Sequence, residues 1–435
     1  MRLPGRIAAA IDVLADLETH RRPVAEALKA WGLANRFAGA GDRAAIGNLV
    51  YDALRRKSSH AYALGSETPR ALVLSVVVRE WGEDIEKLNA SFSGDRFAPT
   101  PISDDEAARL TAADPLAGAP DHVRGDVPEW TVPHLAESFG EGWVEEARAL
   151  SGRPPLDLRV NTLKTTRERM LRSLDHLKPD ETQLIPNGIR FPAGERDSRT
   201  PNVQIEEGYL TGGFEVQDFG SQIVAELAGA KPNEQVLDLC AGAGGKTLAM
   251  AAAMQNRGQV FAYDSDRARL APIYDRLKRA GARNVQVRPP KPGALDDLIG
   301  KLDRVVIDAP CTGSGTWRRQ PTAKWKLPPE QLAQRVEEQR QILIHGATFV
   351  KPGGHLVYIT CSVLPEENQR QIVAFLATHP DFGAIPANTL WMSHFAGAKV
   401  RARFSPEGGV ALTPHATGTD GFYCSVLVRS AALRA

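Results

Sequence analysis

The fold is decided by residues 236–247, which read VLDLCAGAGGKT. The first four residues are mostly apolar, as in a buried strand, and the apolar run after the glycine turn, residues 248–254, has the character of a helix. Glycines at 242, 244 and 245 let the backbone approach a ligand closely, and a helix that begins there offers unpaired N–H groups. This order predicts the first unit of an α/β ligand-binding sheet.

Strand and helix patterns alternate through the C-terminal half of the chain. Apolar segments that resemble strands occur at 235–239, 259–264, 284–287, 304–308 and 355–360, and helical stretches include 267–280 and 330–350. Such alternation is typical of a parallel, doubly wound sheet with helices on its faces. We therefore predict a Rossmann-like α/β domain over residues 213–435.

The N-terminal half has a different pattern. Apolar residues recur at three- and four-residue spacing within residues 1–92, which predicts a helical bundle. Residues 93–127 are rich in Pro, Gly, Asp and Ala and are expected to form a linker. Residues 128–212 combine helical stretches with a strand-like segment at 156–161, so a small α+β subdomain is predicted there.

Composition limits the possible partners. The chain has 435 residues, 43% hydrophobic and 24% charged, with a net charge of +1, so any nucleic-acid surface must be local. No apolar run approaches the roughly 20 residues of a membrane span, and Asp12 interrupts the apolar N-terminus, so no membrane association is expected. Four cysteines without a framework spacing and scattered histidines predict no disulfide and no metal site. We expect a cytoplasmic monomer.

Three cofactors could use the glycine turn. A triphosphate-binding Walker loop would need a glycine where Cys240 stands, and a dinucleotide fingerprint starting at Gly242 would need one at Thr247. An adenosyl cofactor fits better, because Asp264 ends the second predicted strand, where a carboxylate can accept hydrogen bonds from ribose hydroxyls. The turn therefore favours S-adenosylmethionine, although Asp264 could instead be a turn or N-cap residue.

Two of the four cysteines follow predicted strands. Cys311 comes directly after RVVIDAP, and Cys361 directly after LVYIT. If the two strands are neighbours, about 4.8 Å apart, both sulfurs face one crevice at the carboxyl ends of the strands. Free cysteine is often only a small buried hydrophobic residue. Two in matched positions indicate catalysis, and Asp308, at the end of the first strand, is a candidate for polarising a substrate ring, unless it is merely a turn residue.

These segments together resemble the RsmB/Sun branch of the RNA cytosine carbon-5 methyltransferases, in the nucleolar-protein/Sun family. The resemblance covers roughly residues 128–430, and residues 1–92 resemble, less closely, a NusB-like RNA-binding domain. The matching motifs are GFEVQDFGSQ at 213–222, VLDLCAGAGGKT at 236–247, DAPCTGSG at 308–315 with Arg318-Arg319 and Lys324-Trp325, and TCSVLPEEN at 360–368.

The resemblance implies a role for each motif. Cys361 would be the nucleophile that adds to carbon 6 of cytosine, Cys311 would assist release of the methylated base, and Asp308 would hold the polar edge of the base. Small-subunit ribosomal RNA is the substrate expected for this branch, whereas other branches act on transfer RNA or large-subunit RNA. The expected S-adenosylmethionine contacts are Cys240, Ala241, Gly242, Ala243, Gly244, Gly245, Lys246, Asp264 and Asp308.

The chain departs from the family pattern at two places. Ala243 stands where the family usually has a proline. The acidic residue usual after the third strand is missing from residues 284–292, so the adenine amino group must be contacted from elsewhere, or cofactor affinity is reduced.

A basic segment follows the Cys311 loop. Residues 317–326, WRRQPTAKWK, contain Arg318, Arg319, Lys324 and Lys326 with two tryptophans and no acidic residue. Such a segment can neutralise phosphates and stack unpaired bases. The alternative is a solvated loop with a packing tryptophan.

Other protein classes remain open. In DNA cytosine methyltransferases the nucleophile sits in a Pro-Cys dipeptide like Pro310-Cys311, but that family also needs Glu-Asn-Val, and here Gln369 follows Glu367-Asn368. A non-catalytic RNA-binding scaffold and a small-molecule methyltransferase are further alternatives. Methyl transfer, and its dependence on RNA, distinguishes them.

Overall fold

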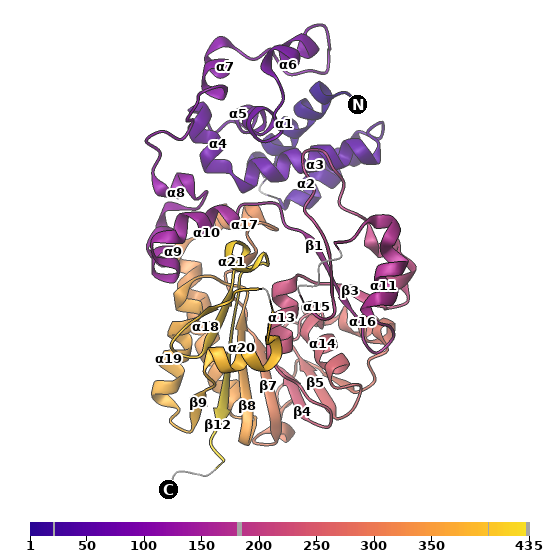
Figure 1. Ribbon diagram of the computed structural model, residues 1–435, viewed down its shortest axis with the longest axis vertical. Coiled ribbons are helices and arrows are strands. Elements are labelled where there is room, and N and C mark those ends of the chain that lie inside the picture. Colours follow the sequence, from indigo (N-terminus) through magenta and orange to yellow (C-terminus); the bar gives the residue numbers. More distant parts are fainter. Residues whose placement is uncertain (21, 181–184, 399, 432–435) are drawn as a thin grey trace. The chain divides into compact units, whose positions relative to one another are not determined.

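The computed structural model describes residues 1–20, 22–180, 185–398 and 400–431 (Figure 1). The chain forms two compact units. The first contains Met1–Pro154, Ala193–Thr200 and Trp317–Lys326. The second contains Pro155–Pro192, Pro201–Thr316 and Leu327–Ala435.

The second unit is built on a mixed sheet with the order β10-β11-β12-β8-β7-β4-β5-β6, and β9 pairs with β12. Strands β6, β5, β4, β7 and β8 run parallel, whereas β12 is antiparallel to β8, β9 and β11. The strands are β4 (Gln235–Asp238), β5 (Gln259–Tyr263), β6 (Val285–Arg288), β7 (Leu302–Asp308), β8 (Val350–Thr360), β9 (Phe382–Ala384), β10 (Arg403–Phe404), β11 (Gly409–Leu412) and β12 (Phe422–Arg429).

All five predicted strands are present, which confirms the α/β doubly wound fold. The sheet is not wholly parallel as predicted, because the four C-terminal strands were missed. Three of them are only two to four residues long. Antiparallel strands also need no intervening helix, so this region lacks the alternating pattern that marks the parallel strands.

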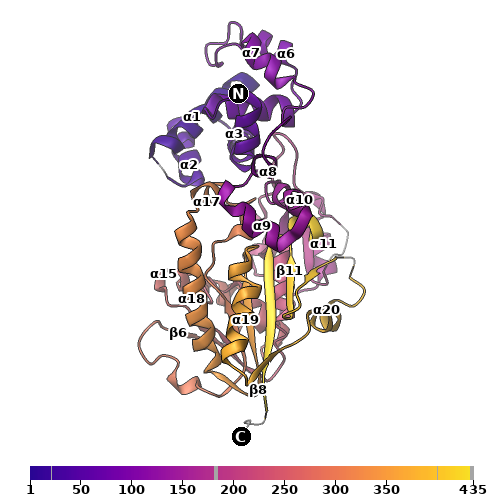
Figure 2. The same ribbon diagram turned by 90° about the vertical axis from the view of Figure 1, so that its left-hand side faces the viewer.

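Helices cover both faces of this sheet (Figures 1 and 2). Successive strand residues point to opposite faces. Val306 and Val357 pack on the side of α13, α14 and α20, whereas Ile307 and Tyr358 pack on the side of α18 and α19. The helices of this unit are α11 (Arg167–Leu174), α12 (Glu207–Leu210), α13 (Phe219–Leu227), α14 (Gly245–Ala253), α15 (Arg267–Leu270), α16 (Ile273–Ala280), α18 (Pro329–Ala347), α19 (Gln369–Thr378), α20 (Ala387–Phe395) and α21 (Pro414–Thr417).

A small antiparallel sheet of β1 (Leu156–Val160), β2 (Gly188–Phe191) and β3 (Phe214–Val216) belongs to the same unit. Its core includes Leu158, Ile189 and Phe214, which pack against Leu174 of α11. The α+β character predicted for residues 128–212 is therefore present. The boundary differs, because residues up to Pro154 belong to the helical unit.

The first unit is helical. Its bundle contains α1 (Leu3–His20), α2 (Val24–Ala34), α3 (Ala40–Arg55), α4 (Lys57–Leu64), α5 (Pro69–Ser75), a π-helix η1 (Val76–Glu80) and α6 (Ile85–Phe92). It also contains α7 (Asp104–Leu110), α8 (Asp121–Arg124), α9 (Val132–Phe139), α10 (Trp143–Ala149) and α17 (Pro321–Lys326). The predicted linker thus carries two helices. Its Ile102 and Leu110 are buried in the core of the bundle, and Ser103 caps α7.

Short 3-10 turns also occur in the described residues. They are η2 (Glu129–Thr131), η3 (Gly140–Gly142), η4 (Asp175–Leu177), η5 (Val203–Ile205), η6 (Asp296–Leu298), η7 (Ser314–Thr316) and η8 (Pro365–Glu367).

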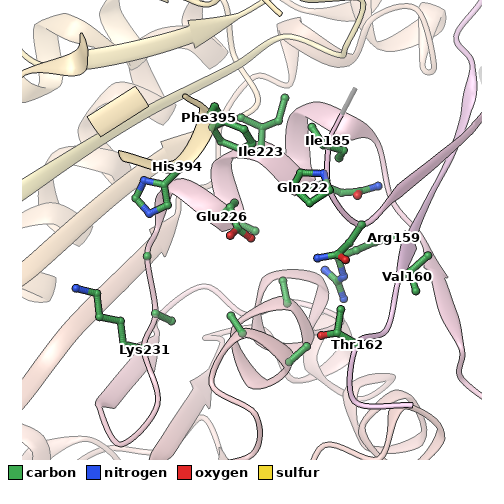
Figure 3. A pocket seen from close by; sticks show the side chains of 18 residues that line it. Arg159, Val160, Thr162, Ile185, Gln222, Ile223, Glu226, Lys231, His394 and Phe395 are labelled. Atoms are coloured by element: carbon green, nitrogen blue, oxygen red, sulfur yellow. The ribbon is translucent and has the colours of Figure 1, made fainter. Parts of the chain in front are cut away.

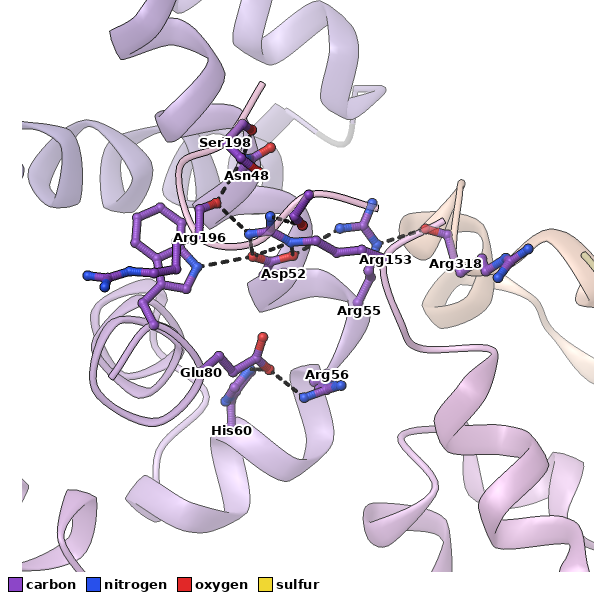
Figure 4. A network of polar contacts seen from close by, with 12 residues as sticks. Asn48, Asp52, Arg55, Arg56, His60, Glu80, Arg153, Arg196, Ser198 and Arg318 are labelled. Carbon is purple, nitrogen blue, oxygen red and sulfur yellow. Dashed lines mark hydrogen bonds and ion pairs between the residues drawn. The ribbon is translucent and has the colours of Figure 1, made fainter. Parts of the chain in front are cut away.

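A buried carboxylate holds the helical unit together (Figure 4). Asp52 of α3 accepts hydrogen bonds from Arg153 Nε at 2.9 Å, Arg55 Nη1 at 3.0 Å and Trp81 Nε1 at 3.3 Å. Arg153 also donates to the carbonyl of Arg196 at 2.7 Å, which joins a later segment of the chain to the bundle. Asp52 is 2% exposed, so these contacts are shielded from water.

We predict that Asp52→Ala destabilises the helical unit by about 3–5 kcal/mol, because Arg55 and Arg153 lose the carboxylate that compensates their charge. Urea unfolding followed by circular dichroism measures this loss. Glu18→Ala, on the exposed face of α1, is the control and should change stability by less than about 0.5 kcal/mol. Equal midpoints for the two variants would contradict the prediction.

Candidate active site

The turn after β4 contains a buried acceptor without a partner. Thr247 Oγ1 donates to Asp238 Oδ2 at 2.6 Å, whereas Asp238 Oδ1 is buried and has no hydrogen-bond partner among the described residues. Burial, with the charges of Asp308 and Asp264, raises the pKa of Asp238 to about 7. A buried acceptor is costly when unsatisfied, so this atom suits a donor group on a ligand.

The turn itself requires glycine. Gly242 and Gly244 have φ values of 49° and 86°, in the left-handed region. A Cβ on Gly244 would also lie 2.6 Å from Ile273 Cγ1. Between the two glycines, the carbonyl of Ala243 accepts a hydrogen bond from Arg276 Nη1 at 2.7 Å. This contact fixes the turn at the position where the family usually has proline.

Asp264 lies beside this turn, at the end of β5. Its Oδ2 accepts from the backbone N–H of Gly242 and its Oδ1 from that of Asp266, both at 2.9 Å. Each carboxylate oxygen has two lone pairs, so each retains one further acceptor position. Asp264 is 2% exposed and is therefore a fixed acceptor.

An ion pair that the sequence analysis missed joins the turn to β7. Lys246 Nζ lies 3.0 Å from Asp308 Oδ2 and 2.8 Å from Ser221 Oγ. The Lys246 side chain is 5% exposed, whereas that of Asp308 is 32% exposed. Asp308 is thus anchored by a buried cation and remains accessible to a substrate.

The two predicted thiols lie together. Strands β7 and β8 are parallel neighbours, with Asp308 opposite Ile359. Cys311 Sγ lies 3.3 Å from Cys361 Sγ, and both cysteines are free and partly exposed. Their hydrogen bond, followed by burial, raises the pKa of Cys311 well above its usual value. Cys311 is therefore protonated at neutral pH.

Glu367 fixes the loops that carry both thiols, and sequence reasoning did not identify this role. It accepts hydrogen bonds from Thr312 N at 2.8 Å and Ser362 Oγ at 2.5 Å, the residues that follow Cys311 and Cys361. The side chain is fully buried, and this burial raises its pKa. The acidic residue next to Asn368 is visible in the sequence, but only the fold shows what it contacts.

A close backbone approach adds a second constraint. The N–H of Gly315 donates to the carbonyl of Cys361 at 3.0 Å, and that of Gly421 donates to the carbonyl of Gly315 at 2.8 Å. A Cβ on Gly315 would lie 2.1 Å from the Gly421 oxygen. The loop after Cys311 therefore requires glycine at this position.

The family described as 16S rRNA methyltransferase RsmB/F matches residues 225–428, and its ferredoxin-like domain matches residues 127–194. A relative from Shewanella oneidensis, ribosomal RNA small subunit methyltransferase B, is 31% identical over 317 residues, which is 73% of this chain and 70% of that protein. The chain belongs to the RsmB/F family. It is an S-adenosylmethionine-dependent RNA methyltransferase.

Solved structures share the fold of this RsmB/F protein. The crystal structure of PH0851 aligns with a TM-score of 0.72 over 98% of this chain and 99% of that chain, at 24% identity. A methyltransferase homologue from Pyrococcus horikoshii aligns with a TM-score of 0.57 over 71% of this chain and 97% of that chain, at 26% identity. The first alignment includes the N-terminal helices, so their association with this fold is not peculiar to this chain.

The residues of the turn fit S-adenosylmethionine. The unpaired Asp238 oxygen and the fixed Asp264 carboxylate are acceptors suited to the amino and hydroxyl groups of that cofactor. No carboxylate comes directly after β6, the third predicted strand of the large sheet, as the sequence indicates. The next acidic residues after β6 are in η6, where Asp296 lines a hollow of about 350 Å³ with Tyr263 and Ser265.

The basic segment of this RsmB/F protein belongs to the helical unit, and two of its four cations are buried. Lys324 Nζ donates to the carbonyl of Arg55 at 2.7 Å and to Ser151 Oγ at 2.8 Å. Burial lowers the pKa of Lys324 to about 7. Lys324 is a packing residue here, whereas Lys326 is exposed and Arg319 is half-buried. The fourth cation, Arg318, is 5% exposed.

A separate cavity of about 300 Å³ is lined by Arg159, Gln222, Lys231 and His394, among others (Figure 3). Its lining, within the described residues, includes none of the predicted catalytic or cofactor residues. The reaction is therefore not assigned to it. In the described parts of the chain, no helix has both the length and the apolar character needed to cross a membrane.

We predict that Asp264→Ala weakens S-adenosylmethionine binding, measured by calorimetry, by roughly 1.5–3 kcal/mol, because a charged acceptor and the anchor of Gly242 are lost. Asp266→Ala is the control. The side chain of Asp266 caps α15 by accepting hydrogen bonds from the N–H groups of Ala268 and Arg269. This substitution removes the cap and leaves Asp264 in place. If both variants bind the cofactor equally well, Asp264 is only a turn residue.

Proposed function

We propose that this enzyme methylates carbon 5 of a cytosine in small-subunit ribosomal RNA, with Cys361 as the nucleophile. The observation that carries the proposal is the 3.3 Å contact between Cys311 and Cys361 at the ends of neighbouring strands. The substrate is taken from the names of the family and of its Shewanella relative. We expect the enzyme to act in the cytoplasm, because ribosomal RNA is made and assembled into ribosomes there.

The chemistry explains why a thiol is needed. Carbon 5 of cytosine is a poor nucleophile. When the Cys361 thiol loses its proton to solvent and its sulfur forms a bond to carbon 6, the double bond between carbons 5 and 6 opens, and carbon 5 becomes an enamine-like carbon that can attack an electrophilic methyl group. S-adenosylmethionine supplies that methyl group when bound. The carbon-5 proton must then leave and the bond between Cys361 and carbon 6 must break, which restores the aromatic ring and the free cysteine.

The second thiol can move the proton of that last step. A raised pKa keeps Cys311 protonated, and its sulfur already contacts the sulfur that must leave. Cys311 gives its proton to the departing Cys361 sulfur and takes the proton of carbon 5, so both thiols are regenerated. We assign the binding of the polar edge of the base to Asp308, and the ion pair with Lys246 supports this role because it fixes the Asp308 carboxylate.

The target base must leave its stack to reach the crevice, which favours unpaired or remodelled RNA. Within the basic segment, the exposed Lys326 and the half-buried Arg319 are our candidates for phosphate contacts, because their side chains reach the surface whereas Lys324 is buried. The four cations therefore divide into packing residues and candidate RNA ligands.

The two thiols have distinguishable roles. Cys361→Ala should abolish methylation and leave no covalent RNA, because no adduct can form. Cys311→Ala should accumulate a protein–RNA adduct that survives denaturing electrophoresis, since elimination stalls after methyl transfer. Cys424→Ala, a buried cysteine of β12, is the control and should retain turnover.

The opposite pattern, in which Cys311 is needed for the adduct and Cys361 is not, would reverse the assignment. That pattern is the one that a nucleophile in the Pro310-Cys311 dipeptide predicts. If the protein were a non-catalytic RNA-binding scaffold, no variant would form an adduct or transfer a methyl group.

The substrate is tested by bisulfite sequencing of total RNA from cells with and without the gene. A cytosine of small-subunit ribosomal RNA should be protected from conversion only when the gene is present, because methylation at carbon 5 slows deamination. Gene-dependent protection confined to transfer RNA or large-subunit RNA would contradict the proposed substrate and leave the thiol chemistry intact.

A further inference from the structure

The helical unit contains a second basic site, away from residues 317–326 in the sequence. It is a cavity of about 140 Å³ lined by four arginines, Arg56, Arg79, Arg124 and Arg148. Arg56 lies in the turn between α3 and α4, and the other three come from η1, α8 and α10. We call it the arginine cavity.

The charges in the arginine cavity do not balance. Its lining contains two carboxylates, Glu80 and Asp126, against four guanidinium groups. Glu80 is engaged by Arg56 Nη1 and by His60 Nε2, each at 3.1 Å (Figure 4). Even with both carboxylates ionised, an excess of two positive charges remains.

Asp126 is also committed to a partner inside the protein. It accepts from the N–H of Ser59 at 2.9 Å and from Ser59 Oγ at 2.7 Å, and burial raises its pKa. Arg79, whose pKa is lowered by burial, also feels the charge of Asp114, which is not in the lining. Arg124 and Arg148, which also line the cavity, are exposed residues.

Two uncommon backbone conformations border the arginine cavity. Arg79 and Glu80 belong to the π-helix η1, a conformation that occurs frequently at functional sites. Asp126 has a φ of 55°, in the left-handed region that a residue with a side chain rarely adopts. Such a conformation costs about 1–3 kcal/mol and persists where surrounding contacts enforce it, here those from Ser59.

We propose that the arginine cavity binds a phosphate group of the RNA backbone. Guanidinium groups match phosphate oxygens through paired hydrogen bonds, which makes clustered arginines suited to this ligand. A volume of about 140 Å³ is below the roughly 300 Å³ at which pockets for whole small molecules begin, so it suits one oxyanion rather than a nucleotide. The inference rests on the proposed function, which supplies RNA as the phosphate-bearing partner.

The test compares two double variants of the full-length enzyme. Arg124→Gln with Arg148→Gln removes two exposed cavity charges. The matched control, Arg2→Gln with Arg36→Gln, removes two exposed charges of the same unit outside the cavity. Equal thermal midpoints for the two should establish that both fold.

RNA affinity is then measured over a range of salt concentrations. The cavity variant should bind a substrate RNA fragment at least about tenfold more weakly at low salt, because charged hydrogen bonds to phosphate are lost. The slope of log K against log salt should fall by about 0.7, the value for one single-strand phosphate contact. An equal fall in the control would show a general charge effect and overturn the proposal.

The arginine cavity could instead bind free inorganic phosphate. Calorimetry with inorganic phosphate distinguishes this ligand from a phosphate of the RNA backbone. Phosphate that binds the wild type but not the cavity variant, with an unaltered RNA salt slope, would overturn the assignment to RNA. In methylation assays the cavity variant should show a raised KM for RNA and an unchanged kcat. A wild-type enzyme that transfers no methyl group would contradict the proposed function instead, so the two failures are distinguishable.

Discussion

The parallel pairing of β7 with β8 is the constraint on which the site depends. Their register places Asp308 opposite Ile359, so the loops that follow leave the sheet side by side. Parallel strands lie about 4.8 Å apart, and loops that start this close can bring two sulfurs to 3.3 Å. If the register were shifted by one residue, side chains of β8 would exchange faces, and the packing of Tyr358 and Val357 on opposite sides would be lost.

Strand pairing alone does not fix the two loops, and Glu367 supplies what is missing. A buried carboxylate is tolerated only when its oxygens are satisfied. Here donors come from Thr312 beside one thiol, from Ser362 beside the other, and from Gln339 of α18 at 3.0 Å. The buried Glu367 carboxylate receives all of these hydrogen bonds only when both loops are in place. It therefore couples the position of the Cys311 loop to that of the Cys361 loop.

The sequence predicts the parts of this structure that depend on local pattern. The glycine turn, Asp264 and the two cysteines all mark the ends of strands, and strand ends are visible as apolar runs that stop at polar residues. Lys246 and Asp308 each lie within recognised motifs, but their ion pair depends on β4 lying next to β7, which no local pattern specifies. Lys324 shows the same limit, since a run of cations cannot indicate which of them the fold buries.

The contact between the two thiols also bears on which cysteine attacks and which one holds a proton. A cysteine acts as a nucleophile through its thiolate, and a raised pKa makes that form rare at neutral pH. The hydrogen bond to Cys361 and burial both raise the pKa of Cys311, so the attack on carbon 6 is harder for Cys311 than for an ordinary cysteine. The same shift favours a residue that holds a proton until the bond between Cys361 and carbon 6 breaks. In the proposed assignment Cys361 attacks carbon 6, and Cys311, whose sulfur lies 3.3 Å from the Cys361 sulfur, holds the proton that the departing sulfur takes up.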